Sequence, residues 1–285
     1  MHQIADGIFY EDAYPGVTLG AIIMPRGTLM IDAPLRAEDA RTWKSVLLTQ
    51  SRGTHRLLIH LDSHTDRTIG ARHMDCTVIA QQNVLNTFEN RTSVFKGQPM
   101  GSSSEWENYP EVSGTRWSAP SITFSDQMRL HWSELEILIE HHPGPTPGSA
   151  WVIIPSNKVV FIGDAILVDQ PPFLAMSDLP NWIEAVSELR TPHYRGYTII
   201  SGRGGPVSIE YVREQHEQLK ALYKRLETLA EKGASPIDTH SMINPFLEKL
   251  DFPRVLRDPY EQRLRYGLEQ YYQRHYLPEI SDNGN

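Results

Sequence analysis

Ile59-His60-Leu61-Asp62-Ser63-His64-Thr65-Asp66-Arg67-Thr68-Ile69-Gly70 is the stretch from which the rest of this chain of 285 residues is best interpreted. The apolar run that it continues, Leu57 to Leu61, is typical of a buried strand. Alternating polar side chains follow, and a helical segment opens at Thr65. Alternate residues at the end of a strand point the same way, so Asp62, His64 and Asp66 can converge on one ion. The stretch therefore predicts a metal-binding loop.

Five further motifs stand at intervals along the chain. Ahead of the loop lie Asp6-Gly7-Ile8-Phe9-Tyr10 and Gly27-Thr28-Leu29-Met30-Ile31-Asp32. After it come His142-Pro143-Gly144-Pro145-Thr146-Pro147-Gly148-Ser149, Phe161-Ile162-Gly163-Asp164 and Ile200-Ser201-Gly202-Arg203-Gly204. Together these motifs resemble the metallo-β-lactamase superfamily. The pattern of that family is a strand-end His-x-His-x-Asp-His, a Pro-Gly-His-Thr-x-Gly turn, a Gly-Asp after a strand and a late Gly-His-Gly.

The resemblance extends from the N-terminus to about Gly205 and implies an α/β fold, a four-layer αββα sandwich, over residues 1–206. Periodicity alone indicates only an α/β protein. Residues 91–120 are an insertion rich in Gly, Ser and Pro, and they carry Trp106, Tyr109 and Trp117. Such a loop serves as a lid or pocket wall, or is held on the surface by its aromatic residues. Residues 207–285 are expected to form a helical C-terminal extension packed on this domain.

The expected elements follow from apolar periodicity and turn residues. A hairpin is expected at 18–24 and 28–32, and further strands at 57–61, 77–80, 122–124, 134–139, 150–154, 159–162 and 197–200. Helices are expected at 37–50, 65–74, 82–90, 181–190, 207–232, 237–250 and 259–276. Pro206 suits the opening of the long helix, and Ser208 and Glu210 favour its first turn.

The last expected helix carries an apolar stripe at helical spacing. This stripe predicts packing on the sandwich or, alternatively, a homo-oligomer interface through the C-terminal helices. Its members are Tyr260, Leu264, Leu268, Tyr271 and Tyr272.

Four positions depart from the metal-binding pattern that the resemblance supplies. Asp62 stands where the family has its first His, and Arg67 replaces the adjoining His. Pro145 replaces the His of the turn, and Arg203 replaces the last His. The positions that agree with the family are His64, Asp66 and Asp164, in a register fixed by the spacing of Asp66 and Gly70.

These replacements have direct chemical consequences. Proline offers no donor atom, and arginine remains protonated and cannot bind a cation. Zinc sites need about three nitrogen, sulfur or oxygen ligands from the protein. The usual dinuclear zinc centre is therefore not expected. We expect instead that Arg67 and Arg203 point into one pocket with Asp66 and Asp164 and pair with these carboxylates.

The surviving residues suggest a first functional hypothesis, an atypical hydrolase of the superfamily with at most one metal ion. Asp62, His64, Asp66 and Asp164 are its expected ligands, an oxygen-rich set that suits Mn²⁺, Fe²⁺ or Mg²⁺ better than a pair of zinc ions. Asp66, Arg67 and Arg203 are the candidate catalytic residues, the arginines steadying an oxyanion. The substrate would be a small ester, amide or phosphoester.

Other interpretations stay open. A metal-free descendant can bind a small anionic ligand or a protein partner through the old pocket, without catalysis. Redox chemistry like that of the related flavodiiron proteins is disfavoured, because no flavodoxin-like segment follows. Asp66 and Asp164 can also be structural, and His64 can be a hydrogen-bonded histidine without a metal. His60, inside an apolar strand, is expected to be a satisfied core residue.

Composition limits the class of protein. A chain of this length with 40% hydrophobic residues can bury a sizeable core. The net charge of -8 argues against a nucleic-acid partner, and no apolar stretch reaches membrane length. Cys76 is the one cysteine, so an intrachain disulfide is excluded. A reducing cytoplasm is the expected location, and a small-molecule ligand the expected partner.

Overall fold

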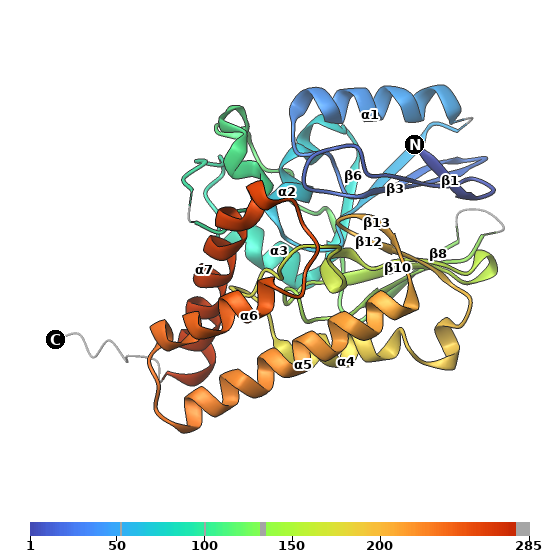
Figure 1. Ribbon diagram of the computed structural model, residues 1–285. Coiled ribbons are helices and arrows are strands. Elements are labelled where there is room, and N and C mark those ends of the chain that lie inside the picture. The colour runs from blue at the N-terminus through green and yellow to red at the C-terminus, as the bar shows by residue number, and fades with distance from the viewer. Residues whose placement is uncertain (52, 100, 132–134, 278–285) are drawn as a thin grey trace.

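In the computed structural model two β-sheets face each other, and helices cover their outer sides (Figure 1). The structure describes residues 1–51, 53–99, 101–131 and 135–277.

The first sheet has the order β1-β2-β3-β4-β5-β6-β7. Its strands are His2–Ala5, Ile8–Glu11, Leu19–Met24, Gly27–Ile31, His55–Ile59, Thr77–Gln81 and Ile122–Phe124. The second sheet has the order β13-β12-β11-β10-β9-β8. From β8 to β13 its strands are Gln127–Leu130, Ile137–His141, Ala150–Ile154, Val159–Phe161, Thr198–Ser201 and Gly205–Val207.

Parallel pairing in both sheets decides where functional side chains can gather. β4, β5, β6 and β7 run parallel in the first sheet, and β11 and β12 run parallel in the second. These strands are short apolar runs, which is typical of strands covered on both faces. Their carboxyl ends share an edge of each sheet, where ligand sites of α/β proteins are commonly found.

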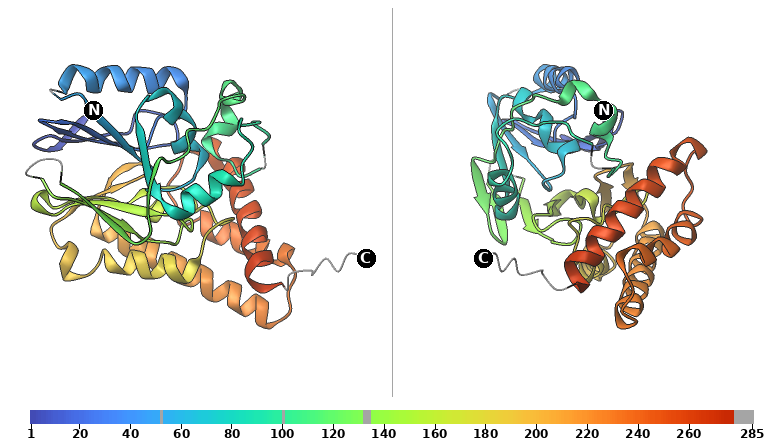
Figure 2. Two further views of the ribbon diagram at one scale, coloured as in Figure 1. Left: turned by 180° about the vertical axis from the view of Figure 1, so that it is seen from behind. Right: turned by 90° about the vertical axis from the view of Figure 1, so that its left-hand side faces the viewer.

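The helices form the two outer layers and close one end of the sandwich. α1 (Ala37–Gln50) covers the first sheet, and α4 (Leu179–Glu188) and α5 (Ile209–Glu231) lie against the second (Figure 2). α7 (Arg257–Tyr276) stands across the end of the sandwich, beside the insertion. The shorter helices are α2 (Thr65–Thr68), α3 (Gln82–Glu89) and α6 (Ile243–Leu247). The expected αββα sandwich is confirmed.

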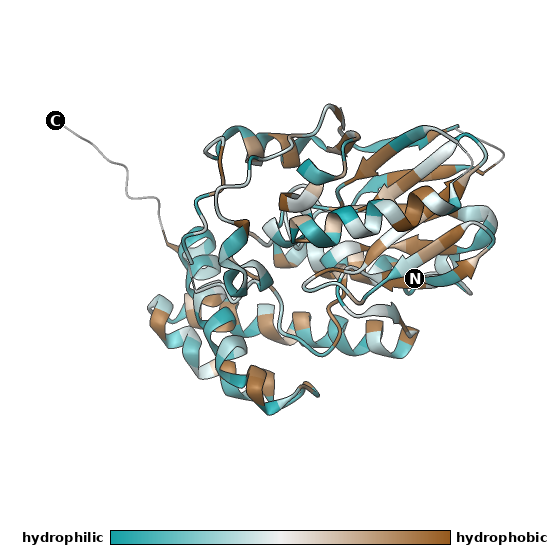
Figure 3. Ribbon diagram, turned by 90° about the horizontal axis from the view of Figure 1, so that it is seen from above, coloured by the Kyte–Doolittle hydropathy of each residue, from teal (hydrophilic) through white to brown (hydrophobic). Residues whose placement is uncertain are grey.

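Three apolar clusters hold these layers together. One lies between the sheets and includes Ile22, Ile59 and Phe161. A second packs α1 on the first sheet through Trp43. The third joins α4, α5 and α7 to the second sheet around Trp182. The view from above shows strands dominated by apolar residues and helices with mixed faces, as expected for layers with one wet side (Figure 3).

Local sequence signals mark the starts of the main helices. The side chain of Asp178 accepts a hydrogen bond from the backbone N–H of Asn181 (3.0 Å), and Pro180 lies in the first turn of α4. Ser208 caps α5 in the same way through Tyr211 N (3.1 Å). The expectation that Pro206 opens this helix was wrong, because Pro206 lies in the edge strand β13.

Several elements differ from the expected ones. The strands β1, β2, β8 and β13 are short and carry too few residues for a periodic signal. The expected helix 65–74 consists of α2 and a 3₁₀ helix, Ile69–His73, and the expected helix 237–250 is largely a 3₁₀ helix, Pro236–Met242. The expected strand 134–139 is β9, and residue 134 lies outside the described residues.

The C-terminal helices pack on the sandwich as the stripe predicted. The stripe residues Tyr260, Leu264, Leu268, Tyr271 and Tyr272 belong to the same buried cluster as Trp182 of α4. The homo-oligomer interface stays a prediction. Among the helices in the described part of the chain, none combines the length and apolarity needed to cross a membrane.

We expect Leu264→Ala to lower the free energy of unfolding by about 2–5 kcal/mol, because this fully buried side chain would leave a cavity. Chemical denaturation followed by circular dichroism measures the change. Arg265→Ala, at the exposed neighbouring position of α7, is the control and should change stability little. Equal stability of the two variants would contradict the packing of α7.

Candidate functional site

The site is built where parallel strands of the two sheets end. Asp32 follows β4 and Asp62 lies shortly after β5 in the first sheet. Asp164 follows β11 and Arg203 follows β12 in the second sheet. The carboxylate of Asp32 accepts the backbone N–H of Leu61 (3.0 Å), which fixes the loop after β5. The parallel pairing therefore brings acidic and basic side chains from both sheets to one edge.

Arg67, in α2, is the centre of this cluster. Its guanidinium group is fully buried and contacts three carboxylates. Nη1 lies 2.9 Å from Asp32 Oδ2, and Nε lies 3.1 Å from Asp62 Oδ1. Nη2 donates to Asp164 Oδ1. A single cation of the protein thus links the carboxylates of both sheets.

Arg203 forms the second set of ion pairs. Its Nε lies 3.2 Å from both oxygens of Asp164, and its Nη1 donates to Asp66 Oδ2 at 2.9 Å. Asp66 also accepts the backbone N–H groups of Glu105 (3.2 Å) and Trp106 (2.9 Å). Asp66 therefore caps a short 3₁₀ helix of the insertion, Glu105–Asn108, and both of its oxygens have partners.

Charge pairing controls the protonation of these carboxyl groups. Burial by itself raises the pKa of Asp62, but the charge of Arg67 and the pairing with His64 outweigh it and hold this pKa well below its usual range. Burial likewise opposes ionisation of Asp164, and the charges of Arg203 and Arg67 lower its pKa. The pKa of Arg67 is raised despite its burial, by Asp164, Asp62 and Asp32. Asp62, Asp164 and Arg67 are therefore charged at neutral pH.

His64 lies at the more open side of the cluster. Its Nδ1 is 3.0 Å from Asp62 Oδ2 and 3.3 Å from Asp164 Oδ2. These three donor atoms lie within 4.8 Å of one another, close enough to surround one ion. Asp66, the fourth expected ligand, does not join this group and faces Arg203 instead. The carboxylates of Asp62 and Asp164 are each also engaged by a guanidinium group.

Two glycines provide the space that Arg67 occupies. A Cβ atom at Gly202 would lie 2.9 Å from Arg67 Nη1 and 2.8 Å from the backbone of Gly163. Gly163 has a φ of +56°, in the left-handed region that glycine adopts without strain. The guanidinium group and the backbone that surrounds it are therefore matched in shape.

An aromatic residue and a further arginine cover the cluster. The guanidinium carbons of Arg203 and Arg263 lie 4.6 Å and 3.9 Å from the centre of the Phe173 ring. Arg263, in α7, donates to the backbone carbonyls of Pro171 (3.1 Å) and Ser103 (2.8 Å). Burial and the charge of Arg203 lower the pKa of Arg263 to about 10. The C-terminal helix thus takes part in closing the site.

The expectations for the site can now be compared with its geometry. Arg67 and Arg203 point into one buried cluster with Asp66 and Asp164. Arg67 pairs with Asp164 and Arg203 pairs with both aspartates, so this prediction is confirmed. His60 is buried as expected, but its ring nitrogens have no hydrogen-bond partner among the described residues, so it is not a satisfied core residue.

Three contributors were missed at the level of sequence. Asp32 ends a strand in a quoted motif, and the strand-end rule applied to Asp62 would have found it. Phe173 lies in a loop and gives no periodic signal. Arg263 adjoins the apolar stripe of α7, but a buried arginine there resembles any helical arginine until its partners in distant loops are known.

The donor set does not fit a dinuclear zinc centre. Arg67 and Arg203 hold protonated nitrogen atoms against the carboxylates that would have to bind metal, and neither can act as a ligand. Pro145, in the turn, contributes no donor. At this edge of the sheets, the described residues leave Asp62, His64 and Asp164 as a group of three donors.

The comparisons with known proteins agree with this architecture. Residues 83–195 match the family model of the metallo-β-lactamase superfamily. The chain is similar to the solved structure of the sec-alkylsulfatase Pisa1 from Pseudomonas sp., with 16% identity, a TM-score of 0.67, and coverage of 96% of this chain and 49% of that chain. This chain has the metallo-β-lactamase fold. None of the curated proteins matches the sequence.

Smaller metallo-β-lactamase-fold proteins match the sandwich over nearly their whole length. A metallo-β-lactamase from Pontibacter korlensis has 13% identity and a TM-score of 0.59, and the match covers 76% of this chain and 97% of that chain. One from Erythrobacter litoralis has 13% identity and a TM-score of 0.55, with coverage of 77% and 95%. By contrast, this chain spans about half the length of the alkylsulfatase that it matches.

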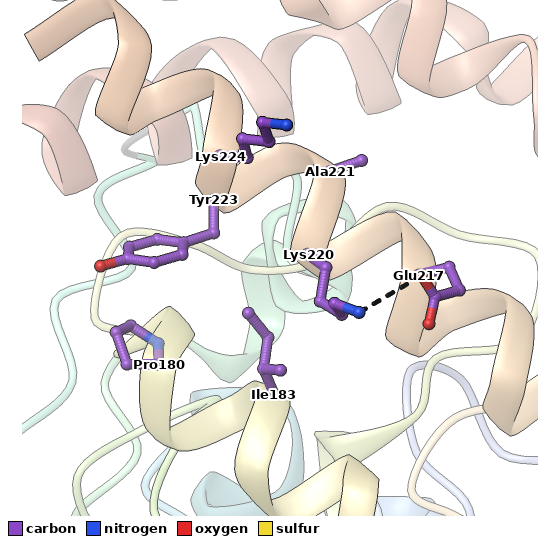
Figure 4. A pocket seen from close by; sticks show the side chains of 7 residues that line it. All are labelled: Pro180, Ile183, Glu217, Lys220, Ala221, Tyr223 and Lys224. Carbon is purple, nitrogen blue, oxygen red and sulfur yellow. Dashed lines mark ion pairs between the residues drawn. The ribbon is translucent and has the colours of Figure 1, made fainter.

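A surface groove also lies on the outer helical layer, between α4 and α5 (Figure 4). Its volume is about 530 Å³, and Lys220 and Glu217 form an ion pair at its edge (3.6 Å). Pro180, Ile183 and Tyr223 line it, and none of its lining residues belongs to the cluster of charged side chains around Arg67. The groove is therefore separate from the candidate site.

The lowered pKa values predict acid sensitivity. A carboxyl group whose pKa is lower in the folded state stabilises the protein above its unfolded-state pKa, and this contribution disappears as the pH falls through the folded-state pKa. Asp62 and Asp164 both follow this rule, so the free energy of unfolding should fall steeply below about pH 4.

Urea denaturation between about pH 2 and pH 7 measures this dependence. Asp164→Asn should lower the free energy of unfolding by about 3–5 kcal/mol at neutral pH, because it leaves buried guanidinium groups with less countercharge. It should also weaken the fall of this free energy between neutral and acid pH. Asp251→Asn, at an exposed position, is the control. If Asp164→Asn lost as much stability at acid pH as the wild type, this carboxylate would not be the cause of the acid sensitivity.

Proposed function

We propose that this protein is a metal-independent member of the metallo-β-lactamase fold that binds a small anionic ligand at the closed former metal centre and does not catalyse hydrolysis. The observation that supports this proposal is the position of Arg67, whose guanidinium group contacts Asp32, Asp62 and Asp164 together. A protein cation takes the place in which metal ions would neutralise these carboxylates.

The energetics oppose entry of a metal pair. Removing a carboxylate from its buried guanidinium partner costs about 3–5 kcal/mol. A cation about 4 Å from a fixed guanidinium charge also meets a repulsion of roughly 4 kcal/mol per unit charge at an effective dielectric constant of about 20. Arg91 and Arg263 add positive charge near Asp62 and near Asp164. Four arginines, Arg67, Arg91, Arg203 and Arg263, thus lie near the four aspartates of the site. Glu105 adds a fifth carboxyl group near Arg203 and Arg263.

Hydrolysis is disfavoured for a related reason. Metal ions supply metallohydrolases with a water nucleophile at neutral pH. Here Asp66 uses both oxygens to hold Arg203 and the insertion, so it is not free to act as a base. Arg67 is enclosed by carboxylates and has no open side toward an oxyanion. We therefore assign Asp66, Arg67 and Arg203 to charge pairing rather than to catalysis.

Unused hydrogen-bond donors support an anionic ligand. Arg203 Nη2 and Arg263 Nε are buried and have no partner among the described residues. Both guanidinium groups contact the Phe173 ring. A buried charged donor without an acceptor costs roughly 1–3 kcal/mol, so an anion that accepts from both would be stabilised here.

A second candidate function retains one metal ion. It is favoured by the position of His64 Nδ1, 3.0 Å and 3.3 Å from the facing oxygens of Asp62 and Asp164. Two carboxylates and one imidazole suit Mn²⁺ or Fe²⁺. The protein would then be a mononuclear hydrolase of a small ester, amide or phosphoester.

Metal analysis separates these candidates. After purification without chelators, we expect no metal ion whose binding depends on His64, and no hydrolysis of a β-lactam or a secondary alkyl sulfate. The comparison of the wild type with His64→Gln by elemental analysis identifies metal held at the centre. One equivalent of manganese or iron that is lost in His64→Gln would favour the mononuclear hydrolase, and a zinc pair with hydrolytic activity would refute both candidates.

Anion binding is tested with sulfate, phosphate and acetate. Each anion that binds should raise the unfolding temperature above that in chloride of equal ionic strength, because a ligand of the folded state adds stability. We expect the added stabilisation to disappear in Arg263→Gln and to remain in Arg265→Gln, the exposed control on the same helix. Sulfate also stabilises proteins by exclusion from their surface, so equal shifts in both variants would contradict an anion site.

A further inference from the structure

A second group of polar side chains lies away from the buried cluster, between the second sheet and α4. Glu140 is in β9, His142 follows this strand directly, and Glu188 is the last residue of α4. Glu140 and His142 are two positions apart along the strand direction, so their side chains project to the same face. His142 Nε2 lies 3.3 Å from Glu140 Oε2, and His142 Nδ1 lies 3.5 Å from Glu188 Oε2.

The imidazole ring of this group is held in place by stacking. His142 and Trp151 have ring centres 3.7 Å apart and an interplanar angle of 17°. Trp151 is fully buried, so it provides a rigid base for the histidine. Glu188 remains partly exposed, which leaves the group open to solutes. A histidine fixed in this way holds its ring nitrogens in a constant position between the carboxylates of Glu140 and Glu188.

A buried hydroxyl group without a partner adds an independent sign of a missing ligand. Tyr194 packs edge-on against Trp151, with ring centres 5.8 Å apart. Its hydroxyl oxygen is buried and has no hydrogen-bond partner within the described ranges of the chain. Burial raises the pKa of this hydroxyl, and the charges of Glu188 and Glu140 raise it further. The hydroxyl thus lies within electrostatic range of both carboxylates, and no direct hydrogen bond joins it to either.

The surroundings leave this group rich in negative charge. Glu188 ends α4, where the helix dipole already places partial negative charge, and the last turn of α4 has no basic residue. The nearby arginines are engaged elsewhere, since Arg129 pairs with Glu136 and Arg190 faces His216. His193 and Arg129 also act on Glu140, and their charges lower the pKa of this carboxyl group.

We propose that Glu140, His142 and Glu188 bind one divalent transition-metal ion, with the Tyr194 hydroxyl group orienting a water molecule that completes the coordination. The three donor atoms lie within 4.8 Å of one another. One imidazole nitrogen and two carboxylate oxygens suit Zn²⁺ or Co²⁺, with ligands at about 2.0–2.2 Å and an open position for water. The ion would join the end of α4 to β9 and neutralise both glutamates. This site is independent of the proposed function, because it shares no residue with the buried cluster.

The test uses Co²⁺ as an optical probe. The metal-free full-length protein is titrated with Co²⁺, and visible absorption and tryptophan fluorescence are recorded, followed by displacement with Zn²⁺. We expect one equivalent to bind with an absorption change and with quenching of Trp151, which lies against the ligand His142. Trp151→Phe should remove the specific quenching.

Variants decide which residues hold the ion. His142→Gln and the partly exposed Glu188→Gln should each weaken binding by at least about tenfold. His141→Gln is the matched control, because this neighbouring histidine contacts the carbonyl of Pro147 (2.8 Å) and not the group. His64→Gln should also leave this binding unchanged. The proposal is overturned if no Co²⁺ binds, if His142→Gln binds normally, or if binding depends on His64.

Discussion

The burial of one guanidinium group against carboxylates from both sheets is the constraint on which this molecule depends. Arg67 cannot lose its proton, so it must be surrounded by negative charge wherever water is excluded. Asp32 and Asp62 supply that charge from the first sheet and Asp164 from the second. The glycines Gly163 and Gly202 leave the space for it. The edge at which the two sheets meet is therefore organised around a cation that belongs to the chain.

Such a network adds less net stability than the number of its ion pairs suggests. Desolvation of charges offsets much of their attraction, and apolar residues of similar shape often replace a buried ion pair without loss. Incomplete networks are costly, however, so each member makes the others necessary. The contacts of this network form a chain. Arg203 links Asp164 to Asp66, and Asp66 in turn accepts hydrogen bonds from the insertion at Glu105 and Trp106. The ion pairs of Arg203 and the hydrogen bonds of Asp66 thus connect the insertion to both sheets.

The resemblance of the motifs to a known family implied the sandwich, whereas periodicity alone indicated only an α/β protein. The inward direction of Arg67 and Arg203 was predicted because their positions within the motifs are a local property of the sequence. The sequence could not predict what closes the site. Phe173 and Arg263 meet the cluster through loops whose course is set by tertiary packing. Asp66 could have capped its own helix, and the backbone that it caps instead is that of the insertion, far along the chain. The edge strands β1 and β13 were not predicted, because in strands this short the pairing with neighbouring strands decides the structure more than the residue pattern does.

The sequence separation of these ion pairs and hydrogen bonds has a consequence for folding. Arg67 and Asp164 are 97 residues apart, Arg203 and Asp66 are 137 apart, and Arg263 and Ser103 are 160 apart. Contacts of such long range require large loops to close before any of them forms, which makes them late and slow. Until both sheets and α7 are in place, these charges must remain hydrated, so early collapse of the apolar layers around them is opposed. The last step of folding should thus be a joint dehydration of the cluster, and the same step in reverse should limit the rate of unfolding.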